Sequence, residues 1–121
     1  MNKDSPLQEL KDAVRRFCEA RDWDQYHDAK DLAIGVSTEA AELLEHFRFK
    51  SKEEIKAFFE DAKKREDIED EMADVLFFLL RMAQRYDIDL AKALERKIEK
   101  NGQKYPVEKA KGKNHKYTEL Q

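Results

Sequence analysis

Apolar residues recur every three or four positions along most of this 121-residue chain, and this is the spacing of amphipathic helices. No segment shows the strict alternation of a half-buried strand, and β-branched residues are scarce. The whole chain contains only three glycines and two prolines, the residues that most often interrupt helices. The pattern therefore predicts an all-α fold, an antiparallel helical bundle of four to five helices.

Capping signals divide this pattern into helices. Ser5-Pro6 is typical of an N-cap and first helical position, and Ser51 followed by Glu54 is typical of a capping box. Pro106 cannot continue a helix and ends the last one. Five helices are predicted. The first covers residues 6 to 21–23, the second covers 29 to 47 or 49, and the third runs from 51 to a bend at 64–66. The fourth continues from that bend to 85 or 86, and the fifth covers 87 or 89 to 100–104.

The bundle is predicted to occupy residues 1–106, followed by a lysine-rich C-terminal tail at residues 107–121. This tail contains four lysines and few residues that could pack, so we expect it to be mobile or to lie as an arm on a neighbour.

Composition narrows the possible partners. The 24 basic and 27 acidic residues give a formal charge of −3, which offers no reason to expect nucleic-acid binding. The longest apolar run, residues 75–80, is too short to cross a bilayer, and no signal peptide precedes residue 5. The single cysteine, Cys18, lies in a helical pattern and is expected to be a buried, inert thiol. We expect a soluble, cytoplasmic protein without a membrane or nucleic-acid partner.

One stretch has an unusual charge density. The sequence EDIEDEMADVLFFLL, residues 66–80, opens with six carboxylates in nine residues and then becomes almost wholly apolar. Like charges three and four positions apart on a helix repel each other. Such a stretch is either the solvated start of a helix, helped by the helix dipole, or part of a site that binds cations.

A second segment matches this one. VSTEAAELLEHF, residues 36–47, aligns with IEDEMADVLFFL, residues 68–79, so that Glu39 and Glu42 correspond to Glu71 and Asp74, 32 residues later. Each pair lies on one helix face, at the edge of an apolar stripe. If the two helices pack antiparallel, the four carboxylates converge, and they would repel unless protonated or neutralised by cations. Hard oxygen ligands favour Mg²⁺, with Mn²⁺ as a substitute. The alternative is two amphipathic helices with acidic, wet edges.

These two acid pairs resemble the signature of the all-α nucleoside triphosphate pyrophosphohydrolases, the MazG-like superfamily. Further segments resemble its dCTP pyrophosphatase branch: residues 20–27, 35–50, 70–83, 100–106 and 116–120. The resemblance implies that residues 1–106 are a catalytic domain that hydrolyses a nucleotide between the α and β phosphates. It also implies Mg²⁺ at Glu39, Glu42, Glu71 and Asp74, and a dimer or tetramer.

The resemblance also implies residues that bind the nucleotide. Lys97 and Asn101 match a lysine and an asparagine that meet the phosphates and sugar, with Lys104 another turn along. Trp23 matches an aromatic residue near the base. Phe49, Phe78 and Val14 replace a tryptophan, a tyrosine and a histidine of vertebrate relatives. Stacking survives these changes but polar contacts with the base do not, so we expect a graded preference for pyrimidine deoxynucleotides. We assign no role in metal or substrate binding to the histidines His27 and His46.

The resulting hypothesis is metal-assisted hydrolysis of a phosphoanhydride, with Glu42 or Glu45 orienting or deprotonating the attacking water. A di-iron bundle would need Glu-x-x-His motifs, which the sequence lacks. A non-catalytic interaction protein with an acidic edge is the other alternative. Large apolar residues are also too many for one small subunit, which predicts that a homo-oligomer completes the bundle: Phe47, Phe49, Phe58, Phe59, Phe77 and Phe78.

Overall fold

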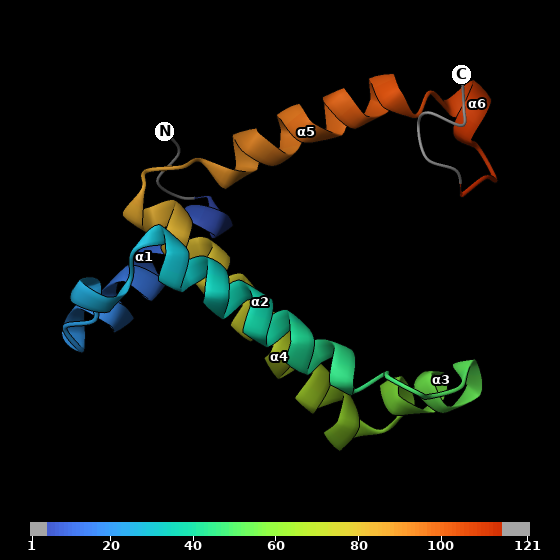
Figure 1. Cartoon of the computed structure of the whole chain (residues 1–121), viewed down its shortest axis with the longest axis horizontal. Coiled ribbons are helices and arrows are strands. Elements are labelled where there is room, and N and C mark those ends of the chain that lie inside the picture. Colours follow the sequence, from blue (N-terminus) through green and yellow to red (C-terminus); the bar gives the residue numbers. More distant parts are fainter. Residues whose placement is uncertain (1–4, 115–121) are drawn as a thin grey trace. The chain divides into compact units, whose positions relative to one another are not determined.

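The computed structural model describes residues 5–114, and these residues form helices with no strand among them (Figure 1). This confirms the predicted all-α class, while completion of the bundle by oligomerisation stays a prediction. The segment 116–120 that contributed to the family resemblance lies outside the described residues. The elements in chain order are α1 (Pro6–Ala20), η1 (Asp24–Tyr26), α2 (Ala29–Glu45), α3 (Lys52–Glu60), α4 (Ala62–Arg85), α5 (Leu90–Lys104) and α6 (Val107–Ala110).

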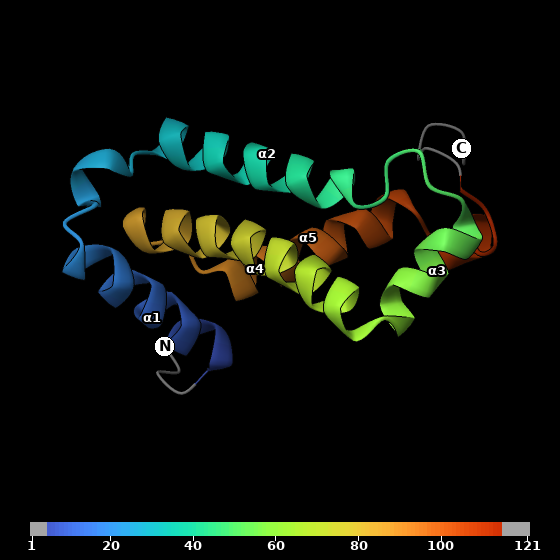
Figure 2. The ribbon, with the colours of Figure 1, turned by 90° about the horizontal axis from the view of Figure 1, so that it is seen from below.

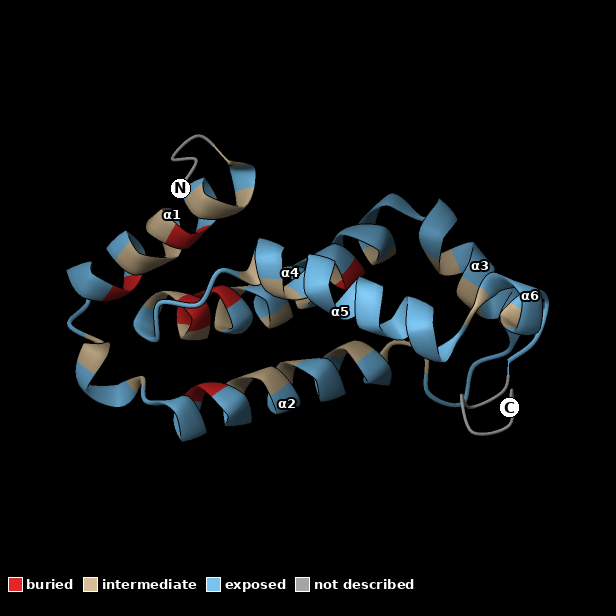
Figure 3. Ribbon diagram, turned by 90° about the horizontal axis from the view of Figure 1, so that it is seen from above, coloured by how far each residue is buried: buried red, intermediate tan, exposed pale blue. Residues whose placement is uncertain are grey.

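The chain divides into two compact units, of which the first ends at Ile88 and the second begins at Asp89. The first unit contains α1 to α4 and every residue of the described chain that is buried. The second contains α5 and α6, and Figure 3 shows α5 exposed along most of its length.

Within the first unit, α2 and α4 lie side by side and run antiparallel (Figure 2). Leu32 of α2 and Ile68 and Leu80 of α4 are buried in the core. The apolar stripes of α2 and α4 are only partly buried, because Leu44 and Met72 keep 58% and 56% of their surface exposed.

Helix α1 packs against the second half of α4. Lys11 is buried and donates a hydrogen bond from Nζ to the carbonyl of Ile88 at 2.9 Å. Cys18 is fully buried, and burial raises the pKa of its thiol. The predicted burial of this thiol is confirmed.

The helix boundaries follow local capping chemistry. The capping box of Ser51 and Glu54 is present at the start of α3. Asp61 ends α3 and caps α4 by accepting hydrogen bonds from two backbone N–H groups, so the bend lies three residues before the predicted 64–66. Helix α2 ends at Glu45, before Phe49 with its left-handed φ of 63°. Asp89 caps α5.

The first residues of the predicted tail, Val107–Ala110, form the short helix α6 after Pro106. In the described part of the chain, no helix is both long and apolar enough to span a membrane.

Candidate active site

Three carboxylates meet where α2 and α4 lie alongside each other. Glu39 and Glu42 come from α2 and Glu71 from α4, and one oxygen of each lies within 4.8 Å of the other two. Glu39 and Glu42 are three residues apart and therefore share a face of α2. The antiparallel packing brings Glu71 to that face, as the matched acid pairs predicted.

The cluster is electrostatically strained. The pKa of Glu39 is raised from 4.5 to about 7 by a hydrogen bond with Glu42, by burial and by the charges of the neighbouring carboxylates. Burial, followed by Glu42, also raises the pKa of Glu71. The Oε2 atoms of Glu39 and Glu71 are buried and accept no hydrogen bond from the described residues. Buried oxygens without a donor are uncommon, and a hard donor set of this kind fits a divalent cation.

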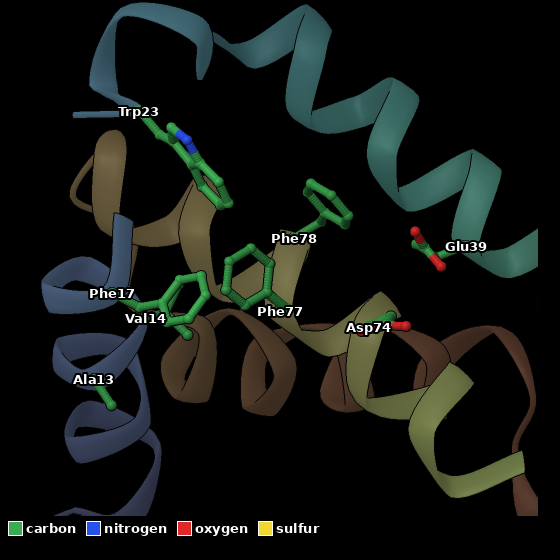
Figure 4. Close-up of a pocket in the computed structure, with 8 residues that line it drawn as sticks. All are labelled: Ala13, Val14, Phe17, Trp23, Glu39, Asp74, Phe77 and Phe78. Atoms are coloured by element: carbon green, nitrogen blue, oxygen red, sulfur yellow. The ribbon is translucent and has the colours of Figure 1, made fainter. Parts of the chain in front are cut away.

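Asp74 and Glu45, the other two predicted catalytic acids, lie apart from these three. Asp74 faces the same space as Glu39 (Figure 4) and contributes to the raised pKa of Glu39, but it is not one of the three that lie within 4.8 Å of one another. Glu45 pairs instead with Arg48 at 3.2 Å, with 62% of its side chain exposed. Asp74 thus lines the same cavity as Glu39, whereas Glu45 faces solvent.

A histidine that sequence reasoning left without a role contacts the cluster. Nε2 of His46 lies 3.6 Å from Oε1 of Glu71. The Nδ1 atom of His46 lies 3.1 Å from Nζ of Lys64, and because an ammonium group only donates, Nδ1 accepts and the ring proton is on Nε2. His46 follows Glu42 by four residues, so helical spacing alone could have placed it on the acidic face.

An apolar cavity of about 500 Å³ opens next to the acids (Figure 4). Its volume is in the range of small-molecule sites, which are mostly apolar with a few polar groups. Here the polar groups are the carboxylates of Glu39 and Asp74. The remaining lining residues come from α1, the turn before η1, and α4: Ala13, Val14, Phe17, Trp23, Phe77 and Phe78.

The aromatic rings of the cavity support one another. Phe17 packs edge-on against both Trp23 and Phe77, with ring centroids 5.7 and 5.9 Å apart. Phe77 packs in the same way against Phe78 at 5.4 Å. Gly35 of α2 makes room for Phe78, because a Cβ atom at Gly35 would lie only 2.6 Å from that ring. Sequence reasoning gave no substrate role to Phe17 or Phe77, whose place in the cavity depends on the packing of α1 against α4.

The predicted substrate-binding residues fall into two groups. Trp23 and Phe78 line the cavity, as does Val14. Phe49 does not, because its side chain is 89% exposed under the guanidinium of Arg48. The α5 residues lie on one helix face of the second unit, and their contact with a nucleotide stays a prediction: Lys97, Asn101 and Lys104.

Comparison with known proteins places the chain among enzymes of nucleotide chemistry. The MazG-like family matches residues 34–120. The chain is 34% identical to rat dCTP pyrophosphatase 1 and 32% identical to the human protein of that name, covering 94% of this chain and 67% of each relative. The crystal structure of a pyrophosphatase from Archaeoglobus fulgidus superposes with a TM-score of 0.76 at 40% identity, covering 83% of this chain and 92% of that one. The chain therefore belongs to the MazG-like family.

Proposed function

We propose that this protein hydrolyses pyrimidine deoxynucleoside triphosphates resembling dCTP to the monophosphate and pyrophosphate, with Mg²⁺ held by its acidic cluster. The enzyme class, nucleoside triphosphate pyrophosphatase, follows from its family and its named relatives. The substrate class, the metal and the roles of individual residues are inferred from the site.

One observation carries the proposal. The carboxylates of Glu39 and Asp74 form one end of an aromatic cavity whose volume suits a base and sugar. A nucleotide with its base among Trp23, Phe77 and Phe78 would extend its triphosphate toward the acids. An apolar cavity alone or an acidic edge alone would not favour this substrate class.

The acidic residues would bind the cation. Glu39, Glu42 and Glu71 already converge, and Asp74 faces Glu39 across the cavity. The buried Oε2 atoms of Glu39 and Glu71 accept no hydrogen bond from the described residues. The hydrogen bond with Glu42, burial and the charges of neighbouring carboxylates raise the pKa of Glu39, and a cation would offset the last of these. Mg²⁺ held there, or Mn²⁺ in its place, would supply positive charge against the triphosphate and make the attacking water more acidic.

The reaction adds water across the anhydride between the α and β phosphates. A carboxylate orients the water and accepts one proton, and pyrophosphate leaves with the bridging oxygen. Of the two candidates for this role, Glu42 fits better than Glu45. Glu42 lies within the acid cluster, whereas Glu45 is paired with Arg48 on the solvent side. The family resemblance implies that Lys97, Asn101 and Lys104 bind the phosphates and sugar, and this stays a prediction.

The base is recognised mainly by stacking. Trp23 and Phe78 offer aromatic faces, and Val14 contributes only apolar surface. An apolar site distinguishes similar ligands by about two orders of magnitude, whereas one that reads hydrogen bonds reaches four or more. We therefore expect a preference for pyrimidines that is graded rather than absolute.

A panel of canonical and modified nucleoside triphosphates with Mg²⁺ tests this proposal. The expected result is release of pyrophosphate, fastest with pyrimidine deoxynucleotides and measurable with others. Equal rates with all bases would contradict the preference, and activity with dCTP alone would contradict its graded character. A non-catalytic interaction protein would show no turnover and no stabilisation by Mg²⁺.

A further inference from the structure

Trp23 forms one wall of the cavity, and a buried arginine, Arg81, contacts the chain segment that follows it. Arg81 is fully buried although it carries a charge. It lies on α4, one helical turn beyond Phe77 and Phe78, and it is not needed by the acidic cluster or by the hydrolysis. A fully buried arginine is rare unless its guanidinium is paired, so its partners indicate what it holds in place.

Two of these partners come from the short segment that joins α1 to α2. Arg81 donates from Nε to Nδ1 of His27 at 2.9 Å and from Nη2 to a carboxylate oxygen of Asp24. It also donates from Nη1 to Gln84 on its own helix at 2.5 Å. The hydrogen bond from Arg81 lowers the pKa of Asp24, so this carboxyl is ionised at neutral pH.

The last turn of α4 adds further contacts to the same segment. Arg85 donates to the carbonyls of His27 and Asp24 at 3.3 and 3.4 Å. Tyr86 accepts a hydrogen bond from the backbone N–H of Ala29 at 2.6 Å, where α2 begins. The segment is thus held by side chains from one end of α4.

Trp23 lies between these anchors. Its backbone N–H donates to the carbonyl of Cys18 at 3.1 Å, after a sharp turn at Asp22, whose φ is 56°. Its indole packs edge-on against both Phe17 and His27, with ring centroids 5.7 and 5.9 Å apart. Asp24 follows it directly in the chain. Fixing Asp24 and His27 therefore fixes the position and tilt of the indole.

We propose that Arg81, acting through Asp24 and His27, is a positioning residue that holds the Trp23 indole in place as the stacking wall for the base. This inference rests on the proposed function for its effect on catalysis, but not for its effect on the indole. The acidic cluster lies at the other end of the cavity, so disturbing the wall weakens nucleotide binding and leaves the hydrolytic step nearly intact.

The main test uses Asp24→Asn, because Asp24 is 46% exposed and asparagine removes its charge while nearly preserving its size, so that no buried cavity is created. Replacing Arg81, which is fully buried, risks unfolding, so Arg81→Lys is a second variant. The matched control is Glu19→Gln, which breaks an exposed carboxylate–arginine pair on α1. Trp23 is the only tryptophan of the chain, so fluorescence of the free protein reports on the wall without any nucleotide.

The expected result for Asp24→Asn is a red-shifted emission and easier quenching by acrylamide. Stacking of a base on an aromatic side chain is worth about 1–3 kcal/mol, roughly 5- to 150-fold. We therefore expect KM to rise roughly tenfold with kcat changed less than about twofold. Glu19→Gln should resemble the parent in both readouts. In a Trp23→Ala background, the effect of Asp24→Asn on KM should disappear, because the wall that it positions is gone.

Unchanged emission and KM in folded Asp24→Asn would overturn the inference, as would a full effect on KM in the Trp23→Ala background. Loss of thermal stability with kcat falling and KM constant would also overturn it, because this is what a purely structural pair produces. If the parent hydrolyses no nucleotide, the proposed function fails, and the fluorescence comparison still decides whether Arg81 positions Trp23.

Discussion

Replacing Glu39 by glutamine removes one negative charge from the acidic cluster and nearly preserves the size of the side chain. In the folded protein Glu39 has a pKa of about 7 instead of 4.5. The folded state therefore holds this proton more tightly than the unfolded chain does. Stability without metal consequently falls as pH rises from about 4.5 to about 7, and the loss is complete above pH 7.

The size of the effect follows from the pKa. A pKa of about 7 instead of 4.5 corresponds to at most about 3 kcal/mol of destabilisation above pH 7. Glu39 is only half-buried, and screening by solvent and salt should reduce this to about 1–2 kcal/mol. Glu39→Gln should therefore be about as stable as the parent near pH 4, below the unfolded pKa, and more stable by that amount near pH 8.

Saturating Mg²⁺ should make the parent more stable than Glu39→Gln, which reverses the order expected without metal. A cation that binds only the native state stabilises it by about 2.7 kcal/mol at a hundredfold excess over Kd. The parent gains this in full and the variant gains less, so the parent becomes the more stable protein. The reversal amounts to a few degrees in Tm, since about 1 kcal/mol shifts Tm by about 3–5 °C in a domain of this size.

Thermal melts at pH 4 and pH 8, with EDTA and with Mg²⁺ at fixed protein concentration, measure all of these effects. The control is Glu69→Gln, which removes an exposed carboxylate of α4 and should change little in any condition. Comparing variant with parent cancels the titration of other groups. The same difference in stability at both pH values would refute the reasoning, as would a stabilisation by Mg²⁺ that is equal in the variant and the parent.

Three further predictions follow from the packing. Asp74→Asn should lose activity as severely as Glu39→Gln, and the double variant should be little worse than either, because the effects of groups that act as a unit are not additive. Steady-state rates measure this, and near-parental activity of only one variant would show that the two acid pairs do not share a site. Gly35→Ala should destabilise the protein by about 1–3 kcal/mol in thermal melts, because the added Cβ would collide with Phe78. Gly102→Ala, which has open space around it, should instead stabilise α5 by about 0.5–1 kcal/mol. A stabilising effect of Gly35→Ala would contradict the tight contact with Phe78. Sedimentation equilibrium at low micromolar concentration should give at least a dimer, because large apolar side chains of α2 and α4 are exposed in one chain; a fully active monomer would contradict this.

Much of the local structure could be predicted because it depends on residues close in sequence. The N-cap at Ser5, the capping box at Ser51 and the cap at Asp89 all act within one turn of helix. The spacing of Glu39 and Glu42 likewise determines that they share a face of α2. The convergence of this pair with Glu71 required only the further assumption of antiparallel packing, which α2 and α4 fulfil.

What the sequence did not predict depends on contacts between distant residues. The pairing of His46 with Glu71 and of Arg81 with Asp24 joins residues 25 or more positions apart. Neither pairing follows from the spacing along one helix, although the four-residue spacing from Glu42 does place His46 on the acidic face. Phe49 lies in a motif that resembles the dCTP pyrophosphatase branch, yet its left-handed φ turns the chain after α2 and leaves the ring in solvent. A motif can thus identify a family without placing each of its side chains in the site.

Product analysis tests the central claim most directly. Incubation of the parent protein with dCTP and Mg²⁺, followed by phosphorus NMR, identifies which anhydride bond is broken. We expect dCMP and pyrophosphate in equal amounts, with no turnover in EDTA and almost none for Glu39→Gln in Mg²⁺. Formation of dCDP and inorganic phosphate, or undiminished turnover by Glu39→Gln, would contradict it.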